Sequence, residues 1–507
     1  MRALLMYPDR DFNLQQELPC HAQALTQDLE LATLLRAMAS EDEFLFDVAR
    51  IALLSGLQND TDTVLYRQEI VRDCLKHPAV VRQLYDLAVE AIVSRKKHWF
   101  GGFLSRYPST ILSGAIELMQ TFVGLLRKLR SIAEEHGGQF ASAGFNTLFT
   151  MLKKELSDAY FASIENHLRE LKFRDGVVVS AQLGEGNKGA NYVLRRARGR
   201  HPNWFQRVLG KGQTGHTVRI ADRDEAGAQI LSELRDRGLN LVANALAQST
   251  DHIVSFFQAL RTELAFYVGC VNLHGRLVAK GEPTCFPQPA PAAERRHYFT
   301  GLYDVCLTLS MEPRVVGNAV DASGKSLVLI TGANQGGKSS FLRSIGLAQL
   351  MMQSGMFVGA ESCTAALCPA LFTHYKRQED ATMKSGKFDE ELARMSAIVD
   401  HVTPHALLLF NESFAATNDR EGAEIARQIV DALLEKHIRV FFVTHLYEFA
   451  RSCFDRGMDG AIFLRAERLP DGTRTFKLIE GGPLETSYGE DLYRQVFAPE
   501  THAVSAA

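Results

Sequence analysis

The residues with the clearest chemical signature form a glycine-rich run from Gly332 to Ser339. The run fits the pattern G-x-x-x-x-G-K-[ST] and lies between an apolar run at 326–331 and a helical pattern over 339–353. Backbone N–H groups of such a turn converge on phosphate oxygens, and the following helix adds its positive N-terminal dipole. Lys338 is expected to reach the β- and γ-phosphates of a nucleotide, and the Ser339 hydroxyl is expected to bind Mg²⁺. The strand before the loop and the helix after it disfavour an ordinary glycine-rich turn. The predicted nucleotide-binding residues are Gly332, Ala333, Asn334, Gln335, Gly336, Gly337, Lys338, Ser339 and Ser340.

A second polar element, Asn411-Glu412, follows the apolar run 406–410. In ATPases with a loop of this type, the strand beside the loop strand ends in Asp, which holds magnesium and is often followed by a catalytic Glu. Asn411 occupies the Asp position, and its amide oxygen can accept but brings no negative charge to the metal. Glu412 is expected to polarise the attacking water as a general base. The alternative is a strand that simply ends at a solvent-exposed polar pair.

A third element is Thr444-His445, directly after the apolar run 440–443. A histidine at the carboxyl end of a third strand can donate to the γ-phosphate and report whether it is present. Taken alone, a histidine after a strand is more often a packed or exposed residue. Together with the loop and with Glu412, the spacing favours the sensor interpretation.

The rest of the chain must position these side chains. From about 302 onward strand-like runs alternate with helical patterns, which is typical of a parallel sheet covered on both faces by helices. Residues 18–171 and 222–273 show helical spacing of apolar residues, and the β-rich runs between them, from 176 to 195, predict a hairpin or small sheet. Residues 281–291 hold four prolines and predict a linker or an extended passage. The expected fold class is α + α/β: a long helical region with a small β insertion, followed by an α/β domain.

Composition excludes several classes of protein. The 507 residues carry a net charge of -3, so any contact with nucleic acid needs a local basic patch. The 8 cysteines include no C-x-x-C pair, which favours reduced thiols over a disulfide framework. The N-terminus has no signal-peptide core, and no apolar run approaches the length of a membrane span. On these grounds the protein is expected to be cytoplasmic.

Several motifs together resemble the MutS family. The run from Ile330 to Ser340 resembles T-G-P-N-M-G-G-K-S-T, including the Asn at the third loop position. The run from Glu412 to Gly422 resembles E-I-G-R-G-T-S-T-Y-D-G, and it keeps Thr417, an acid at Glu421, and Gly422. The run from Phe442 to Phe449 is similar to F-A-T-H-Y-F-E-L, and Val316-Gly-Asn318 is a further landmark. The resemblance covers residues 300–495 well and the helical region more weakly.

The resemblance implies a homodimer that binds ATP or ADP with Mg²⁺ between its ATPase domains, hydrolyses ATP, and changes its grip on DNA. It implies a helical core and lever region over 1–285, with a clamp-like insertion at 176–220, and an ATPase domain over 286–507. The metal ligands would be Ser339 and Asn411, and the catalytic residues Lys338, Glu412 and His445. Three departures from the family pattern stand out: Asn411 itself, a shortened trans signature at Ser385 and Gly386, and an expected absence of the N-terminal mismatch-recognition domain.

Two basic stretches could contact a polyanion. One mixes cations with aromatic residues after the predicted hairpin, and the other spans 94–103. Lysine and arginine supply most non-specific affinity for phosphates, and aromatic rings can stack on exposed bases. The first stretch is preferred because the family's DNA clamp is an insertion in the lever helices. Its candidate DNA contacts are Arg195, Arg196, Arg198, Arg200, Arg207 and Lys211.

The sequence therefore predicts ATP-gated binding of duplex or branched DNA, in repair or recombination. With Asn411 in place of Asp, an alternative is a slow ATP switch with little turnover. A second alternative is a dimeric scaffold whose levers hold a protein partner instead of DNA. A transporter-type ATPase subunit is disfavoured by the long fused helical region and by the sequence of the loop.

Overall fold

The computed structural model describes residues 1–98, 107–173, 176–195, 219–221, 223–377 and 386–485. The chain forms two compact units. The first comprises Met1–Ala3, Arg82–Phe140 and Phe145–Arg261, and the second comprises Leu4–Val81, Ala141–Gly144 and Thr262–Ala507. All eight cysteines are free and six of them are buried, which confirms the prediction of reduced thiols.

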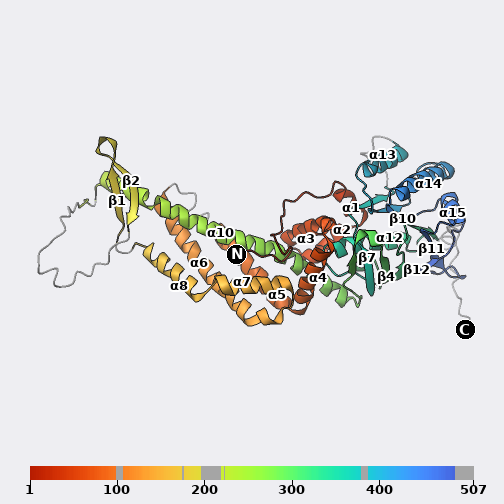
Figure 1. Ribbon diagram of the computed structural model, residues 1–507, viewed down its shortest axis with the longest axis horizontal. Helices are drawn as coiled ribbons and strands as arrows, with labels where there is room; N and C mark the ends of the chain where they lie inside the picture. The colour runs from red at the N-terminus through yellow and green to blue at the C-terminus, as the bar shows by residue number, and fades with distance from the viewer. Residues whose placement is uncertain (99–106, 174–175, 196–218, 222, 378–385, 486–507) are drawn as a thin grey trace, which may run out of the picture. The chain divides into compact units, whose positions relative to one another are not determined.

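Long helices build the first unit and confirm the predicted helical region (Figure 1). Apolar residues at three- and four-residue spacing give each helix one buried face. Phe122 and Phe257 come from two of these helices, α6 and α10, and their ring centroids are 6.2 Å apart. The helices with residues in this unit are α5 (Pro78–His98), α6 (Pro108–His136), α7 (Ala143–Glu155), α8 (Asp158–Glu170) and α10 (Glu225–Ala279), with the 3₁₀ turn η3 (Gly137–Gln139).

Among the described residues one helical stretch, Pro108–Gln139, is long and apolar enough to cross a membrane by length and composition. This finding corrects the expectation that no apolar segment approaches that length. Half of the apolar window is buried inside the protein. Leu118, Phe122 and Leu129 lie on its buried face, whereas Lys128 is solvent-exposed and close to Glu90. These are the properties of a core helix with one apolar face and one polar face.

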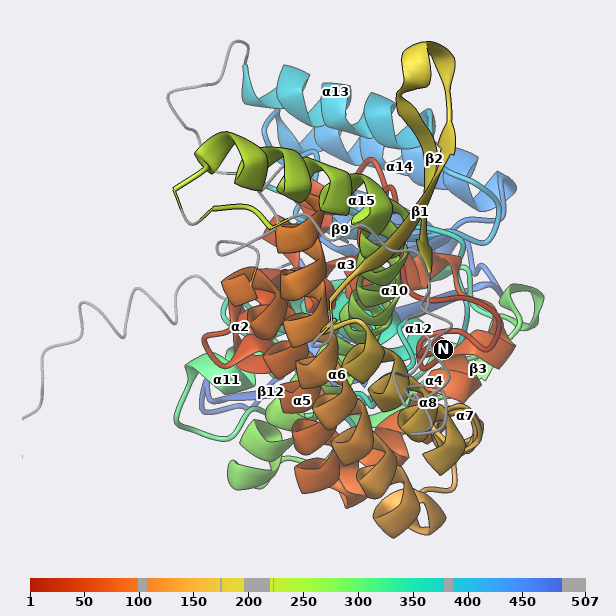
Figure 2. The ribbon, with the colours of Figure 1, turned by 90° about the vertical axis from the view of Figure 1, so that its left-hand side faces the viewer.

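Within the described residues a two-stranded antiparallel sheet confirms the predicted hairpin. It is formed by β1 (Val178–Leu183) and β2 (Gly189–Arg195), joined by the 3₁₀ turn η4 (Glu185–Asn187). The hairpin lies beside the first turns of α10 (Figure 2). A Cβ atom on Gly238 of α10 would lie 2.6 Å from a methyl group of Val179, so only glycine permits this close approach. The remainder of the predicted insertion, 196–218, lies outside the described residues.

The N-terminal segment of the second unit is held by α10 through a buried carboxylate. Glu263 accepts hydrogen bonds from the backbone N–H groups of Leu5 at 2.5 Å, Phe12 at 2.7 Å and Met6 at 3.3 Å. The Tyr267 hydroxyl, one turn along α10, donates to the carbonyl oxygen of Leu5 at 2.5 Å. The helices that follow this segment are α1 (Ala22–Asp28), α2 (Leu31–Ala39), α3 (Glu43–Ser55), the 3₁₀ turn η1 (Gly56–Gln58) and α4 (Thr61–Lys76).

A six-stranded sheet forms the centre of the second unit, with strand order β12-β11-β6-β10-β9-β8. All neighbouring pairs are parallel except β11 with β12, so the predicted parallel sheet carries one antiparallel edge strand. Buried apolar side chains fill its inner strands, as expected for a sheet covered on both faces. The strands are β6 (Leu327–Gly332), β8 (Leu371–Tyr375), β9 (Leu407–Asn411), β10 (Arg439–Val443), β11 (Ala461–Arg468) and β12 (Arg474–Glu480).

Alternate residues of each inner strand point to opposite faces of this sheet. Phe410 and Phe442 belong to one face and stack with ring centroids 4.7 Å apart, in a core that α13, α14 and α15 cover. On the opposite face a Cβ atom on Gly346 of α12 would lie 3.0 Å from Leu409, so α12 packs closely there. Figure 1 shows α12, α14 and α15 around β10 and β11. The helices are α12 (Lys338–Gln353), α13 (Lys387–Val399), α14 (Asp419–Glu435) and α15 (Tyr447–Asp455).

A second, four-stranded sheet has the order β3-β7-β4-β5. It packs beside α12, where Phe299 and Phe341 have ring centroids 6.0 Å apart. The stretch 281–291, predicted as a linker or an extended passage, contributes its first strand. The elements are β3 (Gln288–Ala290), the 3₁₀ turn η5 (Ala292–Glu294), β4 (His297–Leu302), α11 (Val305–Ser310), β5 (Asn318–Asp321) and β7 (Ser362–Ala366).

Candidate functional site

The glycine-rich loop connects the central strand β6 to α12, in the strand–loop–helix order that the sequence predicts. Two glycines are required by geometry. Gly332 has φ 106°, and a Cβ atom there would lie 2.8 Å from the backbone nitrogen of Ala466. Gly337 has φ 86° and is the N-cap of α12. The loop therefore turns sharply at both ends and places backbone N–H groups at the start of a helix, where an anion is favoured.

Lys338 is almost fully buried within this loop. Its Nζ donates to the carbonyl oxygens of Gly332 and Ala333, both at 2.9 Å. Burial lowers the pKa of Lys338 to about 8; the nearby Glu412 carboxylate raises the pKa, and Arg474 lowers it further. Two neutral carbonyl oxygens thus hold the Lys338 ammonium group at the loop. Among the described residues it forms no ion pair that would draw it away.

Ser339 and Asn411 meet at the carboxyl end of the sheet. The Ser339 hydroxyl donates to the side-chain oxygen of Asn411 at 3.0 Å. The sequence placed the Asn411 strand beside the loop strand, and this expectation is wrong, because β10 lies between β6 and β9. The two side chains still converge because parallel strands end at one edge, where Val443 of β10 is in register with both Ile330 and Asn411.

Two oxygen ligands close together suit magnesium, which keeps several waters and takes one or two ligands from the protein. Hydroxyl and amide oxygens are of the hard type that magnesium prefers. Among the described residues, no group of three or more His, Cys, Asp or Glu side chains could hold a metal ion. Ser339 and Asn411 therefore fit a magnesium ion shared with phosphate oxygens, and Asn411 would supply no charge to it.

Glu412 and His445 form a hydrogen-bonded pair beside this position. His445 Nε2 lies 3.0 Å from Glu412 Oε1, and each side chain is about one third exposed (31% and 33%). An ionised carboxylate only accepts, so Nε2 carries the proton in this contact. The hydrogen bond from His445 lowers the pKa of Glu412, and burial acts in the opposite direction. Glu412 is therefore an ionised, solvent-accessible carboxylate next to the loop.

The stretch after Glu412 caps the next helix. Asn418 is the N-cap of α14 and accepts from the backbone N–H of Glu421 at 3.0 Å. The Thr417 hydroxyl donates to the Glu421 carboxylate at 2.8 Å. A Cβ atom on Gly422 would lie 2.4 Å from the carbonyl oxygen of Phe414, so only glycine fits. Thr417, Glu421 and Gly422, which keep the family pattern, thus fix the turn between the site and α14.

A cavity of about 290 Å³ lies against the loop, and the sequence did not predict it. Loop residues Gly337 and Ser340 line it, together with Phe341 of α12 and Phe476 of β12. Its remaining lining side chains are mostly apolar: Leu302, Tyr303, Asp304, Leu307, Met311, Pro313, Arg314, Val315, Val316, Asn318 and Ser344. The landmark Val316-Gly-Asn318 was the one signal in the sequence that could have indicated this wall.

Arg474 is a second cation near the loop that sequence patterns missed. Its Nε donates to the carbonyl oxygen of Asn334 at 2.7 Å, although the two residues are 140 positions apart. Asn318 ties the same edge strand to the cavity wall, because its amide donates to the Phe476 carbonyl at 3.2 Å and its oxygen accepts from Leu478 N–H at 2.7 Å. No local motif marks such residues, because strand pairing brings them to the loop.

Ser385 of the predicted trans signature and most predicted DNA contacts lie outside the described residues. Gly386 is the N-cap of α13, whereas Ser385 lies outside the described residues. Arg195, the last residue of β2, is exposed, and its Nε donates to the Ser180 hydroxyl at 2.9 Å. In the other basic stretch, Arg95 pairs with Asp251 at 2.8 Å, while Lys96 and Lys97 are exposed. The predicted contacts Arg196, Arg198, Arg200, Arg207 and Lys211 lie outside the described residues.

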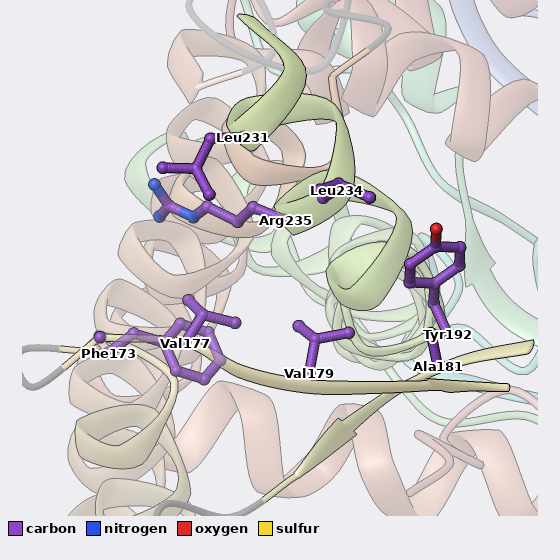
Figure 3. A pocket seen from close by; sticks show the side chains of 9 residues that line it. Phe173, Val177, Val179, Ala181, Tyr192, Leu231, Leu234 and Arg235 are labelled. Carbon is purple, nitrogen blue, oxygen red and sulfur yellow. The ribbon is translucent and has the colours of Figure 1, made fainter. Parts of the chain in front are cut away.

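An apolar groove of about 480 Å³ lies between the hairpin and the first turns of α10 (Figure 3). Val177 and Val179 approach it from the hairpin side, and Leu231 and Leu234 approach it from the helix. Arg235 is the single charged residue of the lining, which also includes Phe173, Gly176, Ala181 and Tyr192. The described part of this surface is therefore mainly apolar rather than cationic.

The mixed sheet, and the glycine-rich loop between its central strand and a helix, define the class: a helical protein with an α/β domain of the nucleotide-binding type. Residues 59–280 match the family model of the MutS2 N-terminal domain. Residues 328–507 match the family model of MutS domain V. The chain belongs to the MutS family.

Curated relatives agree with this assignment. The chain is 30% identical over 190 residues to endonuclease MutS2 of Thermus thermophilus, covering 37% of this chain and 25% of that protein. It is 26% identical over 274 residues to the DNA mismatch repair protein MutS of Streptococcus equi subsp. equi, covering 50% and 32%. It is also 26% identical over 327 residues to MutS of Streptococcus pneumoniae, covering 63% and 38%. The chain thus spans between a quarter and two fifths of the length of these relatives.

Proposed function

We propose that this protein is an ATPase that couples binding and hydrolysis of ATP to its grip on duplex or branched DNA, in repair or recombination. One observation carries the proposal: Lys338, Ser339, Asn411, Glu412 and His445 converge at the carboxyl edge of one parallel sheet. The proposal assigns a core and lever region to residues 1–285, with a clamp-like insertion at 176–220, and a phosphate-loop ATPase domain to 286–507. A cytoplasmic location is part of the same proposal.

In this proposal the loop from Gly332 to Ser340 binds the phosphates. Lys338 exchanges its two carbonyl contacts for oxygens of the β- and γ-phosphates, which restores a charged partner to a desolvated ammonium group. Arg474 adds a second positive charge at the loop, where it contacts the carbonyl oxygen of Asn334. The apolar cavity beside Gly337 and Phe476 accepts the base, because it is concave, mostly apolar and directly adjacent to the loop.

Ser339 and Asn411 would hold magnesium, which would neutralise developing phosphate charge. Glu412 orients and polarises the attacking water. His445 senses the γ-phosphate, since its Nε2–H now donates to Glu412 and a phosphate oxygen would compete for the same proton. Binding of the γ-phosphate would then free the Glu412 carboxylate from His445, so that the carboxylate could accept a hydrogen bond from water. Asn411 brings no charge to the metal, so we expect slow turnover.

The proposed assembly is a homodimer, with Ser385 and Gly386 of each protomer reaching toward the other protomer's nucleotide. The position of Gly386 at the start of α13 supports this role, because the N-terminus of a helix favours a nearby phosphate. The proposed DNA contacts are Arg195, Arg196, Arg198, Arg200, Arg207 and Lys211.

The decisive experiment measures ATP turnover with and without duplex, mismatched and branched DNA, at two salt concentrations. Lys338→Ala serves as the control that removes phosphate binding. We expect turnover that one DNA form stimulates or suppresses, with a smaller effect at high salt. Turnover that is indifferent to every DNA would exclude the DNA coupling, and absent turnover in the wild-type chain would exclude a cycling ATPase.

A second candidate function is a nucleotide-switched dimeric scaffold for a protein partner. The apolar groove of Figure 3 favours it, since exposed apolar patches often mark protein interfaces. Leu231 of its lining is 58% exposed, and Leu183 of β1 and Ile230 of α10 are 78% and 60% exposed. Charge-neutral replacement of Arg195, Arg196, Arg198 and Arg200 discriminates, with replacement of Lys153 and Lys154 in the same unit as control. DNA affinity that is unchanged, with a flat salt slope, would favour the scaffold.

A further inference from the structure

A fully buried histidine connects the turn that carries Glu412 to helix α13. His374 lies in β8, and both His374 and Ser413 are 0% exposed. His374 Nδ1 lies 2.7 Å from the Ser413 hydroxyl oxygen, and Nε2 lies 3.0 Å from the carbonyl oxygen of Glu391 in α13. One imidazole ring therefore touches both the residue after Glu412 and the second turn of α13.

The chemistry of the partners fixes the direction of these hydrogen bonds. A carbonyl oxygen only accepts, so His374 Nε2 carries the proton and donates to Glu391. Burial lowers the pKa of His374 to about 4, with Arg394 acting in the same direction, so the ring is neutral near pH 7. In the neutral ring Nδ1 can only accept, so the Ser413 hydroxyl is the donor, and its one proton is shared between Nδ1 and a backbone acceptor. The Ser413 hydroxyl also lies 2.5 Å from the His374 carbonyl oxygen, which offers the same proton a second acceptor.

The backbone of this turn needs such support. Glu412 has φ 52° and Phe414 has φ 64°, left-handed conformations that non-glycine residues keep only when their surroundings hold them. His374 stacks on Phe414 with ring centroids 5.3 Å apart and planes 20° apart. The Glu391 side chain, 4% exposed, accepts a hydrogen bond from the Phe414 backbone N–H. Helix α13 is thus tied to the turn by two separate contacts, one through His374 and one direct.

We propose that His374 is a positioning residue that couples the placement of α13 to the placement of the Glu412 carboxylate, through the hydroxyl of Ser413. The inference rests on the proposed ATPase function. Helix α13 begins directly after Gly386, which that proposal turns toward the partner's nucleotide. A shift of α13 moves the Glu391 carbonyl, the His374 ring and Ser413 in sequence, and so changes where Glu412 holds water. The family pattern E-I-G has Ile at the position of Ser413, and an isoleucine side chain cannot form this hydrogen bond.

The first test separates turnover from nucleotide binding in the full chain. Ser413→Ala removes the hydroxyl, and we expect about tenfold lower kcat with the Kd for a fluorescent ATP analogue within twofold of wild type. Ser413→Thr keeps the hydroxyl and is expected to restore kcat. Ser354→Ala, which removes another fully buried serine hydroxyl of the same unit, is the matched control and keeps wild-type kcat. Wild-type kcat in Ser413→Ala, or equal losses in Ser413→Ala and Ser354→Ala, would overturn the inference.

The second test measures the chain of contacts from Glu391 through His374 to Ser413, called the relay below, without nucleotide or turnover. Amide hydrogen exchange is compared between wild type, Ser413→Ala and His374→Phe, a change that keeps an aromatic ring against Phe414. We expect faster exchange in residues 388–399 when Ser413 is altered, and in residues 411–415 when His374 is altered. Unchanged exchange in both segments would overturn the relay even if the protein is an active ATPase. Altered exchange in a protein without turnover would instead support the relay and overturn the ATPase proposal.

Discussion

The hydroxyl of Ser339 donates a 3.0 Å hydrogen bond to the side-chain oxygen of Asn411. These residues come from α12 and β9, and β10 separates β9 from the loop strand β6. A carboxylate at position 411 could accept the same hydrogen bond and add one negative charge beside the proposed magnesium position. The amide keeps the geometry of the contact but not its charge, and this difference can be tested.

Replacing Asn411 with Asp should increase magnesium affinity and raise turnover. The added attraction is expected to lower the Mg²⁺ concentration for half-maximal turnover on the order of tenfold, since about 1.4 kcal/mol corresponds to that factor. The measurement is ATP turnover in a magnesium titration. Asn411→Ala is the control and should weaken magnesium binding. Equal turnover in wild type and Asn411→Asp at every magnesium concentration would show that Asn411 does not limit the rate.

We expect Lys338 to give nucleotide binding a pH dependence. Burial lowers its pKa to about 8, so the fraction of charged Lys338 falls as pH rises through 8. Phosphate binding requires the charged form, and ATP affinity should therefore fall between pH 7 and pH 9.5. Equilibrium titration of ATP across this range measures the effect. Lys338→Ala should weaken ATP binding about 100-fold and remove the dependence. A flat profile in the wild-type protein would contradict the role of Lys338.

Replacing Glu412 with Gln should separate binding from hydrolysis. The amide keeps the size of the side chain but cannot act as a general base, so turnover should fall about 10²–10⁴-fold while ATP still binds. The measurements are single-turnover hydrolysis and ATP affinity on the same preparation. His445→Ala should preserve ATP binding and reduce turnover less. Comparable hydrolysis by Glu412→Gln and wild type would remove Glu412 from the mechanism.

Local patterns predicted the elements that carry the loop. The apolar run before Gly332 and the helical spacing after it predicted β6 and α12, and the β-rich runs around Gly186 predicted the hairpin. Such elements depend on residues close together in the chain, where turn chemistry and apolar periodicity act. The charged and polar side chains at strand ends were also predictable, because parallel strands bring their carboxyl ends to one edge.

Pairing between distant segments was not predictable in the same way. The prolines of the stretch 281–291 indicated a linker or an extended passage, yet Gln288–Ala290 pairs with β7 as a strand of the second sheet. The order of β6, β10 and β9 depends on packing of both faces, which no single strand sequence encodes. The contact of Arg474 with Asn334, and that of His374 with Ser413, arise from the same long-range pairing. Sequence reasoning missed both of these contacts for that reason.

Glu263 should make the stability of the second unit depend on pH. Burial raises its pKa to about 7 from an ordinary 4.5, although three backbone N–H groups favour the ionised form. The folded state therefore binds a proton more tightly than the unfolded state between these values. The contribution of Glu263 to the free energy of unfolding should be greatest below about pH 4.5. It should be lost as pH rises through 7. The full change corresponds to about 3 kcal/mol.

Glu263→Gln provides the test, because glutamine resembles the protonated carboxyl group in size and charge. Urea unfolding followed by circular dichroism at pH 5 and pH 8 measures the free energy of unfolding of each protein. We expect wild type and Glu263→Gln to differ little at pH 5, and the variant to lose less stability on going to pH 8. An identical decrease in both proteins would assign the pH dependence to other groups. A large loss in the variant at pH 5 would show that the three N–H contacts to Leu5, Met6 and Phe12 require both carboxyl oxygens.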